Sequence, residues 1–224
     1  MQRTLKIKYL HKISDERKQN FDYNQIAMTF HESGHAICAI NNLVYVFSIN
    51  VMTPKNEEGL TSYYTFNEDY ISDNDLKETI FTAELQTLYA GLIAEKIYYK
   101  DICGSDKFPM HLRIGSSEDM KMASKIIRTN KLVKSGKQTS LLKKQIQKDV
   151  NLFLIENWDA VKAVAHALYK KHRLSFDELK FILTRKTNHN DFWKEKFKKI
   201  KIIYDDKNPP VEQDVKIILD QENI

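Results

Sequence analysis

Residues 26–40, with the sequence IAMTFHESGHAICAI, decide the fold because apolar side chains recur there every three or four positions. This spacing is typical of an amphipathic helix, and we predict a helix over 23–41. His31 and His35 are four positions apart, so both imidazoles lie on one face of that helix. Two imidazoles on neighbouring turns can share a zinc ion, and the intervening glutamate can take a proton from water. The motif therefore predicts two metal ligands and a general base, Glu32.

The composition favours one domain with a substantial core, since 42% of the 224 residues are hydrophobic. The net charge of +5 comes with scattered lysines rather than a basic patch, so we expect no nucleic-acid binding. Two cysteines, Cys38 and Cys103, indicate no disulfide framework, and we interpret Cys38 as a small core residue. No apolar run reaches the roughly 18 residues of a membrane span, and no signal-peptide core is present. We expect a soluble, cytoplasmic protein.

The pattern along the chain predicts a mainly helical α+β fold with a small β-hairpin or sheet beside the first helix. The β-rich segments 44–52 and 60–66 flank a turn that contains proline and glycine, and they predict the hairpin. Residues 1–198 form the predicted domain, which begins with an extended arm or short strand at 1–21. Apolar residues alternate from 199 onward, so we expect 199–224 to be an extension, either a hairpin or a docking tail. Further helices are predicted over 73–99, from 116, over 139–156, around 158–168 and from the capping box Ser175-x-x-Glu178.

A catalytic zinc ion usually has three protein ligands, so the two histidines need a partner. The metzincin pattern would place glycine at position 38 and histidine at position 41, and Cys38 and Asn41 exclude that class. A carboxylate on a later helix is the other route, and the residues alone leave Glu84, Glu95 and Asp119 as candidates. Asp119 also has a second interpretation, because the helix dipole favours an acidic side chain in a first helical turn.

Three blocks in order resemble the peptidase domain of the FtsH family, which are membrane-anchored, ATP-dependent zinc proteases. The blocks are HESGHA at 31–36, LYAGLIAEKIYY at 88–99 and GSSEDMKMAS at 115–124. The family has HEAGHA, a LYGGRLAEEI-like helix and GASNDI, and the resemblance spans residues 24–186. It implies that Asp119 is the third zinc ligand. It also implies that Glu95 accepts a hydrogen bond from a metal-bound histidine and fixes its ring.

The resemblance implies a Zn²⁺-dependent metalloendopeptidase that hydrolyses peptide bonds with metal-activated water. The chain shows no P-loop, so we expect no ATP-driven unfolding and a preference for unfolded or flexible polypeptides. We expect the strand over 44–52 to add an extended substrate at its edge. The predicted substrate-binding residues are therefore Val46, Phe47, Ser48, Ile49 and Asn50. Family members form hexameric rings, which makes a homo-oligomer compatible with the resemblance.

Two other functions fit parts of the sequence. The first is a catalytically silent module that keeps the peptidase fold and docks on a protein partner through 199–224. The second is nucleic-acid binding through the basic C-terminal half, which would weaken steeply with salt. No aromatic and basic recognition motif supports the second function.

Overall fold

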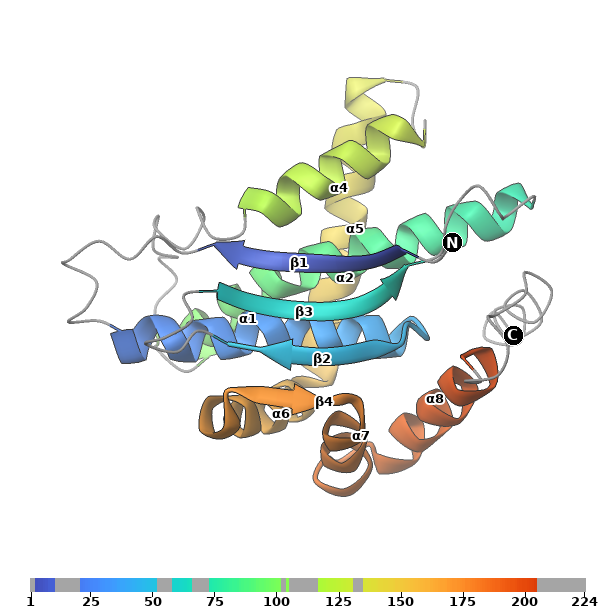
Figure 1. Cartoon of the computed structure of the whole chain (residues 1–224). Helices are drawn as coiled ribbons and strands as arrows, with labels where there is room; N and C mark the ends of the chain where they lie inside the picture. The colour runs from blue at the N-terminus through green and yellow to red at the C-terminus, as the bar shows by residue number, and fades with distance from the viewer. Residues whose placement is uncertain are drawn as a thin grey trace.

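The computed structural model describes residues 3–10, 21–51, 58–65, 73–101, 104, 117–130 and 135–204. Within these residues the chain is mainly helical with one small antiparallel sheet, which confirms the predicted fold class (Figure 1). The helices are α1 Phe21–Asn41, α2 Asn74–Asp101, α4 Ser117–Thr129, α5 Gly136–Glu156, α6 Trp158–Lys171, α7 Phe176–Arg185 and α8 Asn190–Ile203. The strands are β1 Arg3–Leu10, β2 Val46–Asn50, β3 Glu58–Thr65 and β4 Arg173–Ser175.

The four strands form one sheet in the order β1-β3-β2-β4, and every neighbouring pair is antiparallel. β2 and β3 are the predicted hairpin strands, with Val46 opposite Tyr63. The register shifts between Val46 and Ser48, so an irregularity interrupts the pairing there. β1 lies within the predicted N-terminal arm, whose residues 11–20 lie outside the described part of the chain.

Over residues 48–50, β2 does not have the free edge that an added substrate strand would need. β3 pairs with one side of β2, and β4 pairs with the other side over residues 48–50. The prediction that a substrate adds along Ser48, Ile49 and Asn50 is therefore wrong, because their backbone is already flanked on both sides. Of the other two residues assigned to substrate binding, Val46 is buried and Phe47 is 36% exposed. The covering strand β4 is distant in the sequence, so no local pattern around β2 indicates it.

Helix α1 is enclosed by other elements along most of its length. It packs against β2 and β3, and also against α2 and α6. Figure 1 shows α1 and α2 running behind the sheet. Every residue from 27 to 40 is buried, so the helix is a core helix rather than an amphipathic surface helix. A methyl group at Gly34 would lie 2.5 Å from the carbonyl oxygen of Ala90 on α2, so glycine permits the close approach of the two helices.

The predicted capping box begins α7. The Ser175 hydroxyl accepts a hydrogen bond from the backbone N–H of Glu178, and the Glu178 carboxylate accepts one from the backbone N–H of Ser175. Two backbone donors at the start of the helix are thereby satisfied.

The predicted change of structure at residue 199 is wrong for the segment 199–203. These residues belong to α8, and Ile200 and Ile203 are buried. A spacing of three places both side chains on one helical face, which the apparent alternation of apolar residues concealed. Residues 205–224, the rest of the predicted extension, lie outside the described part of the chain. Among the described helices, none combines the length and apolar character that crossing a membrane requires.

Candidate metal centre

A buried group of polar side chains forms where α1, α2 and the first turn of α4 meet. His31 and His35 lie one turn apart on α1, and their Nε2 atoms are 2.8 Å apart. Asp119, in the first turn of α4, places Oδ2 3.2 Å from His31 Nε2 and 3.4 Å from His35 Nε2. The three side chains are essentially inaccessible to solvent. The predicted ligands thus come together as a group that can hold a metal ion.

Each histidine is oriented through its other ring nitrogen. His35 Nδ1 lies 2.7 Å from the backbone carbonyl oxygen of Thr87. A carbonyl only accepts, so His35 Nδ1 carries the proton and the Nε2 lone pair remains for a ligand bond. His31 Nδ1 lies 3.2 Å from Glu95 Oε1. Glu95 is therefore beside the ring that it was expected to orient, whereas the contribution of Thr87 comes from its backbone and has no sequence signal.

The spacing of the three ligand atoms fits a small divalent ion. With bonds of about 2.0–2.1 Å, neighbouring ligands of a tetrahedral ion lie about 3.3 Å apart, close to the three distances above. Two Nε2 lone pairs that face each other at 2.8 Å repel unless a proton or a metal ion lies between them. Asp119 Oδ1 is buried and has no hydrogen-bond partner among the described residues. Two imidazoles and a carboxylate are a donor set that suits transition metals.

Gly91 on α2 also belongs to the site, although the HExxH motif does not indicate it. A methyl group at this position would lie 2.5 Å from His35 Nε2 and 2.6 Å from His31 Nε2. A carbon atom at these distances would overlap both nitrogens, so the missing side chain leaves space beside the two Nε2 atoms. Its sequence signals are its place in the block 88–99 and a glycine in the interior of a helix, which usually has a packing or functional reason.

The side chain of Glu32, on α1, is buried against β3. Thr61 on β3 donates a hydrogen bond of 2.5 Å from its hydroxyl to Glu32 Oε2. The other oxygen, Oε1, is buried without a hydrogen-bond partner in the described part of the chain. Burial raises the pKa of Glu32 to about 7, although both histidines and Thr61 act in the opposite direction. A carboxyl group with this pKa can accept and release a proton near neutral pH.

The charges around the ligands favour a cation at this place. Burial lowers the pKa of His31, but Glu95 and Asp119 outweigh it and raise this pKa to about 10. Burial raises the pKa of Asp119, but His35 and His31 outweigh it and lower this pKa to about 2. At neutral pH the group therefore holds a proton on His31 unless a metal ion takes its place.

The other candidate ligands are not part of the described metal group. Glu84 lies on α2 and does not belong to it. Cys38 is buried, and burial raises the pKa of its thiol to about 12, which fits a core residue rather than a ligand. Cys103 lies outside the described residues.

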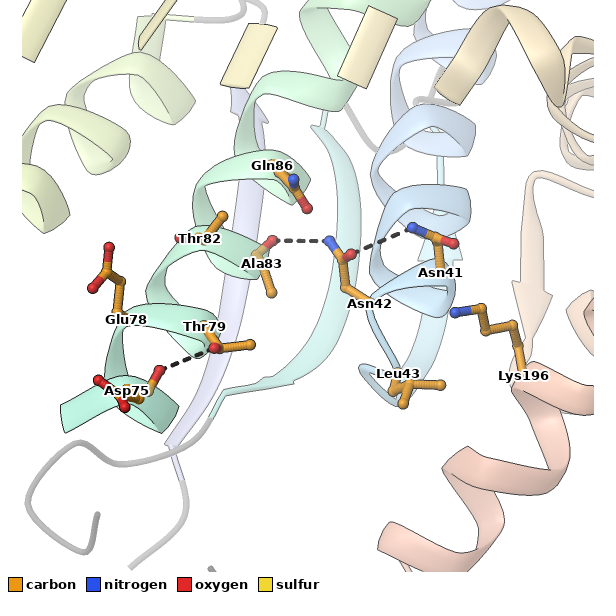
Figure 2. A pocket seen from close by; sticks show the side chains of 10 residues that line it. All are labelled: Asn41, Asn42, Leu43, Asp75, Glu78, Thr79, Thr82, Ala83, Gln86 and Lys196. Atoms are coloured by element: carbon orange, nitrogen blue, oxygen red, sulfur yellow. Dashed lines mark hydrogen bonds between the residues drawn. The ribbon is translucent and has the colours of Figure 1, made fainter. Parts of the chain in front are cut away.

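A surface cavity of about 610 Å³ lies at the C-terminal end of α1 (Figure 2). Its lining is mostly polar, and Asn42 Nδ2 there donates to the carbonyl oxygen of Ala83 at 3.3 Å. Lys196 reaches it from α8. None of His31, His35 and Asp119 is among the described residues that line this cavity.

No protein-family model and no curated protein matches this chain. The function must therefore be inferred from the chemistry of the buried group.

Proposed function

We propose that the protein is a zinc-dependent metallopeptidase that uses His31, His35 and Asp119 to hold the ion and Glu32 as general base. The observation that carries the proposal is the convergence of Asp119 on the two histidines, which the motif alone does not require. Two imidazoles and one carboxylate leave a fourth position for water or substrate in a catalytic zinc site. The ordered blocks that resemble the FtsH peptidase domain support the same assignment.

The chain supplies both the ligand geometry and the proton transfer. Zinc, when bound, polarises the scissile carbonyl and lowers the pKa of water toward neutrality. Thr87 and Glu95 hold the two imidazole rings in position. Glu32 takes a proton from the attacking water and delivers it to the departing amine, which its pKa of about 7 permits in both directions. We propose unfolded or flexible polypeptides as substrates.

The test compares zinc content and cleavage of an unfolded casein substrate in the wild type and in Glu32→Gln. We expect Glu32→Gln to retain one zinc per chain and to lose cleavage by a factor of about 10²–10⁴. Glu195→Gln, an exposed position on α8, is the matched control and should cleave like the wild type. Equal cleavage by Glu32→Gln and the wild type would refute the proposal.

A second candidate is a catalytically silent module in which the metal stabilises the fold. The observation that favours it is the burial of every ligand, since structural metal sites are closed to solvent. In that case zinc removal would lower the melting temperature, while neither the wild type nor Glu32→Gln would cleave any peptide. Activity of the zinc-loaded wild type excludes this alternative.

A further inference from the structure

Thr61 occupies a position from which it can fix the general base, and no motif assigns it a role. Both Thr61 and Glu32 are 0% exposed. The Thr61 hydroxyl lies 2.5 Å from Glu32 Oε2 and 3.3 Å from the Glu32 backbone carbonyl oxygen. A hydroxyl has one proton, and the shorter distance assigns that proton to the carboxylate.

We propose that Thr61 is a positioning residue that holds Glu32 Oε2 and thereby leaves Oε1 to receive the proton of the attacking water. This inference rests on the proposed peptidase function. The two carboxylate oxygens are not equivalent, because Oε2 has the Thr61 hydroxyl and Oε1 has no partner among the described residues. A glutamate that can turn about its side-chain bonds would present the reactive oxygen in the correct place only part of the time.

The sheet makes Thr61 a rigid support. Thr61 lies on β3 opposite Ile7 of β1 on one side and opposite Ile49 of β2 on the other. Its backbone is thus held from both directions, and its β-branched side chain has restricted rotation. A support built on a paired strand positions a catalytic group more precisely than one built on a loop.

The contact also has a purely structural interpretation, in which the hydroxyl only offsets the cost of burying a carboxylate. The two interpretations differ in what the isosteric variant Thr61→Val loses. If Thr61 positions the base, kcat should fall about 10–100-fold, with KM and zinc content close to the wild type. A structural role alone would lower stability or zinc content and leave the kcat of the folded, zinc-loaded enzyme unchanged.

Three further variants complete the test. Thr61→Ser keeps the hydroxyl and should restore most of kcat, while Thr61→Ala should resemble Thr61→Val and replaces it if the valine variant fails to fold. Thr184→Val removes a buried threonine hydroxyl on α7 that donates to the carbonyl of Lys180, and it should cleave like the wild type. An unchanged kcat in Thr61→Val, or in Thr61→Ala if it is used instead, overturns the proposal.

A measurement on the metal-free protein separates this inference from the proposed function. Because this hydrogen bond is buried, the hydroxyl proton of Thr61 should exchange slowly and give a signal in the NMR spectrum. We expect this signal to vanish in Thr61→Val, to shift in Glu32→Gln and to persist in Thr184→Val. Absence of the signal in the wild type overturns the Thr61 inference even if the enzyme is active. If the signal is present but no peptide is cleaved, the peptidase proposal has failed and Thr61 has no base to position.

Discussion

Replacing Gly91 with alanine tests the geometry of the metal centre most directly. The added methyl group would lie 2.5 Å from His35 Nε2, 2.6 Å from His31 Nε2 and 2.7 Å from His31 Cε1. Ordinary contacts are about 3.5–4.0 Å, so the methyl overlaps both rings by about 1 Å. His35 cannot retreat freely because its Nδ1 donates to Thr87, and α1 already lies close to α2 at Gly34.

Two effects of opposite sign act on the metal-free protein. Overpacking a close contact costs about 1–3 kcal/mol, whereas alanine in place of glycine in a helix interior gains about 1 kcal/mol. The metal-free Gly91→Ala variant should therefore lose between about 0 and 2 kcal/mol of unfolding free energy.

The Gly91→Ala variant should lose more free energy of metal binding than of unfolding, because the methyl group occupies space next to both Nε2 atoms. Zinc at a hundred times its dissociation constant stabilises the folded state by about 2.7 kcal/mol. For a chain of this size that corresponds to a rise in melting temperature of about 5–11 °C, which the variant should not show.

The assay is thermal unfolding with chelator and with excess zinc, together with equilibrium dialysis of the metal. Gly136→Ala is the matched control, because a methyl group there meets nothing within 4 Å. It should be slightly more stable than the wild type and show the full response to zinc. A wild-type zinc response in Gly91→Ala would refute the placement of the site against α2.

Two more results are expected from the same protein. Metal uptake should release a proton from His31, whose pKa in the metal-free protein is about 10, so affinity should rise about tenfold per pH unit between pH 7 and 9. Without metal, His31 should stabilise the fold fully below its unfolded pKa of about 6.5, and this contribution should fade toward pH 10. Calorimetry in buffers of different ionisation enthalpy counts the protons released on metal binding. The Asp119→Asn variant should release fewer protons than the wild type. A metal affinity that does not change with pH would contradict the protonated state of His31. Tyr63→Phe removes a buried hydroxyl that has no hydrogen-bond partner among the described residues, so urea unfolding should show unchanged or higher stability. A loss of 1 kcal/mol or more would mean that this hydroxyl is satisfied.

Local sequence patterns predicted most helices and strands and the two histidine ligands, because these features depend on short spacings along the chain. The four-residue interval between His31 and His35 fixes a shared helical face, and the Ser175 capping box fixes the start of α7. Asp119 is 88 residues from His31, and its first-turn position is equally typical of an ordinary helix. From the sequence, only the resemblance to the FtsH peptidase domain indicated Asp119 as the third ligand.

The wrong prediction for β2 concerns pairing between segments that are far apart in the sequence. β4 covers the outer side of β2, and nothing near either segment encodes that contact. Thr61 and Gly91 join the site only because β3 and α2 both pack against α1. One is a common strand residue and the other a helical glycine, so neither has a chemical signature in the sequence.

The strand order also determines which strand edge is unpaired while the protein is being synthesised. β2 leaves the ribosome about 125 residues before β4, which at about 5–20 residues per second leaves its outer side unpaired for about 6–25 s. The nascent chain therefore carries an open sheet edge, and it lacks the aspartate needed for tight metal capture, through much of translation. Stalled chains that end before Asp119 should bind chaperones with or without zinc. Zinc should protect stalled chains from proteolysis only when they are long enough for Asp119 to have left the ribosome. Zinc-dependent protection of shorter chains would contradict this order of events.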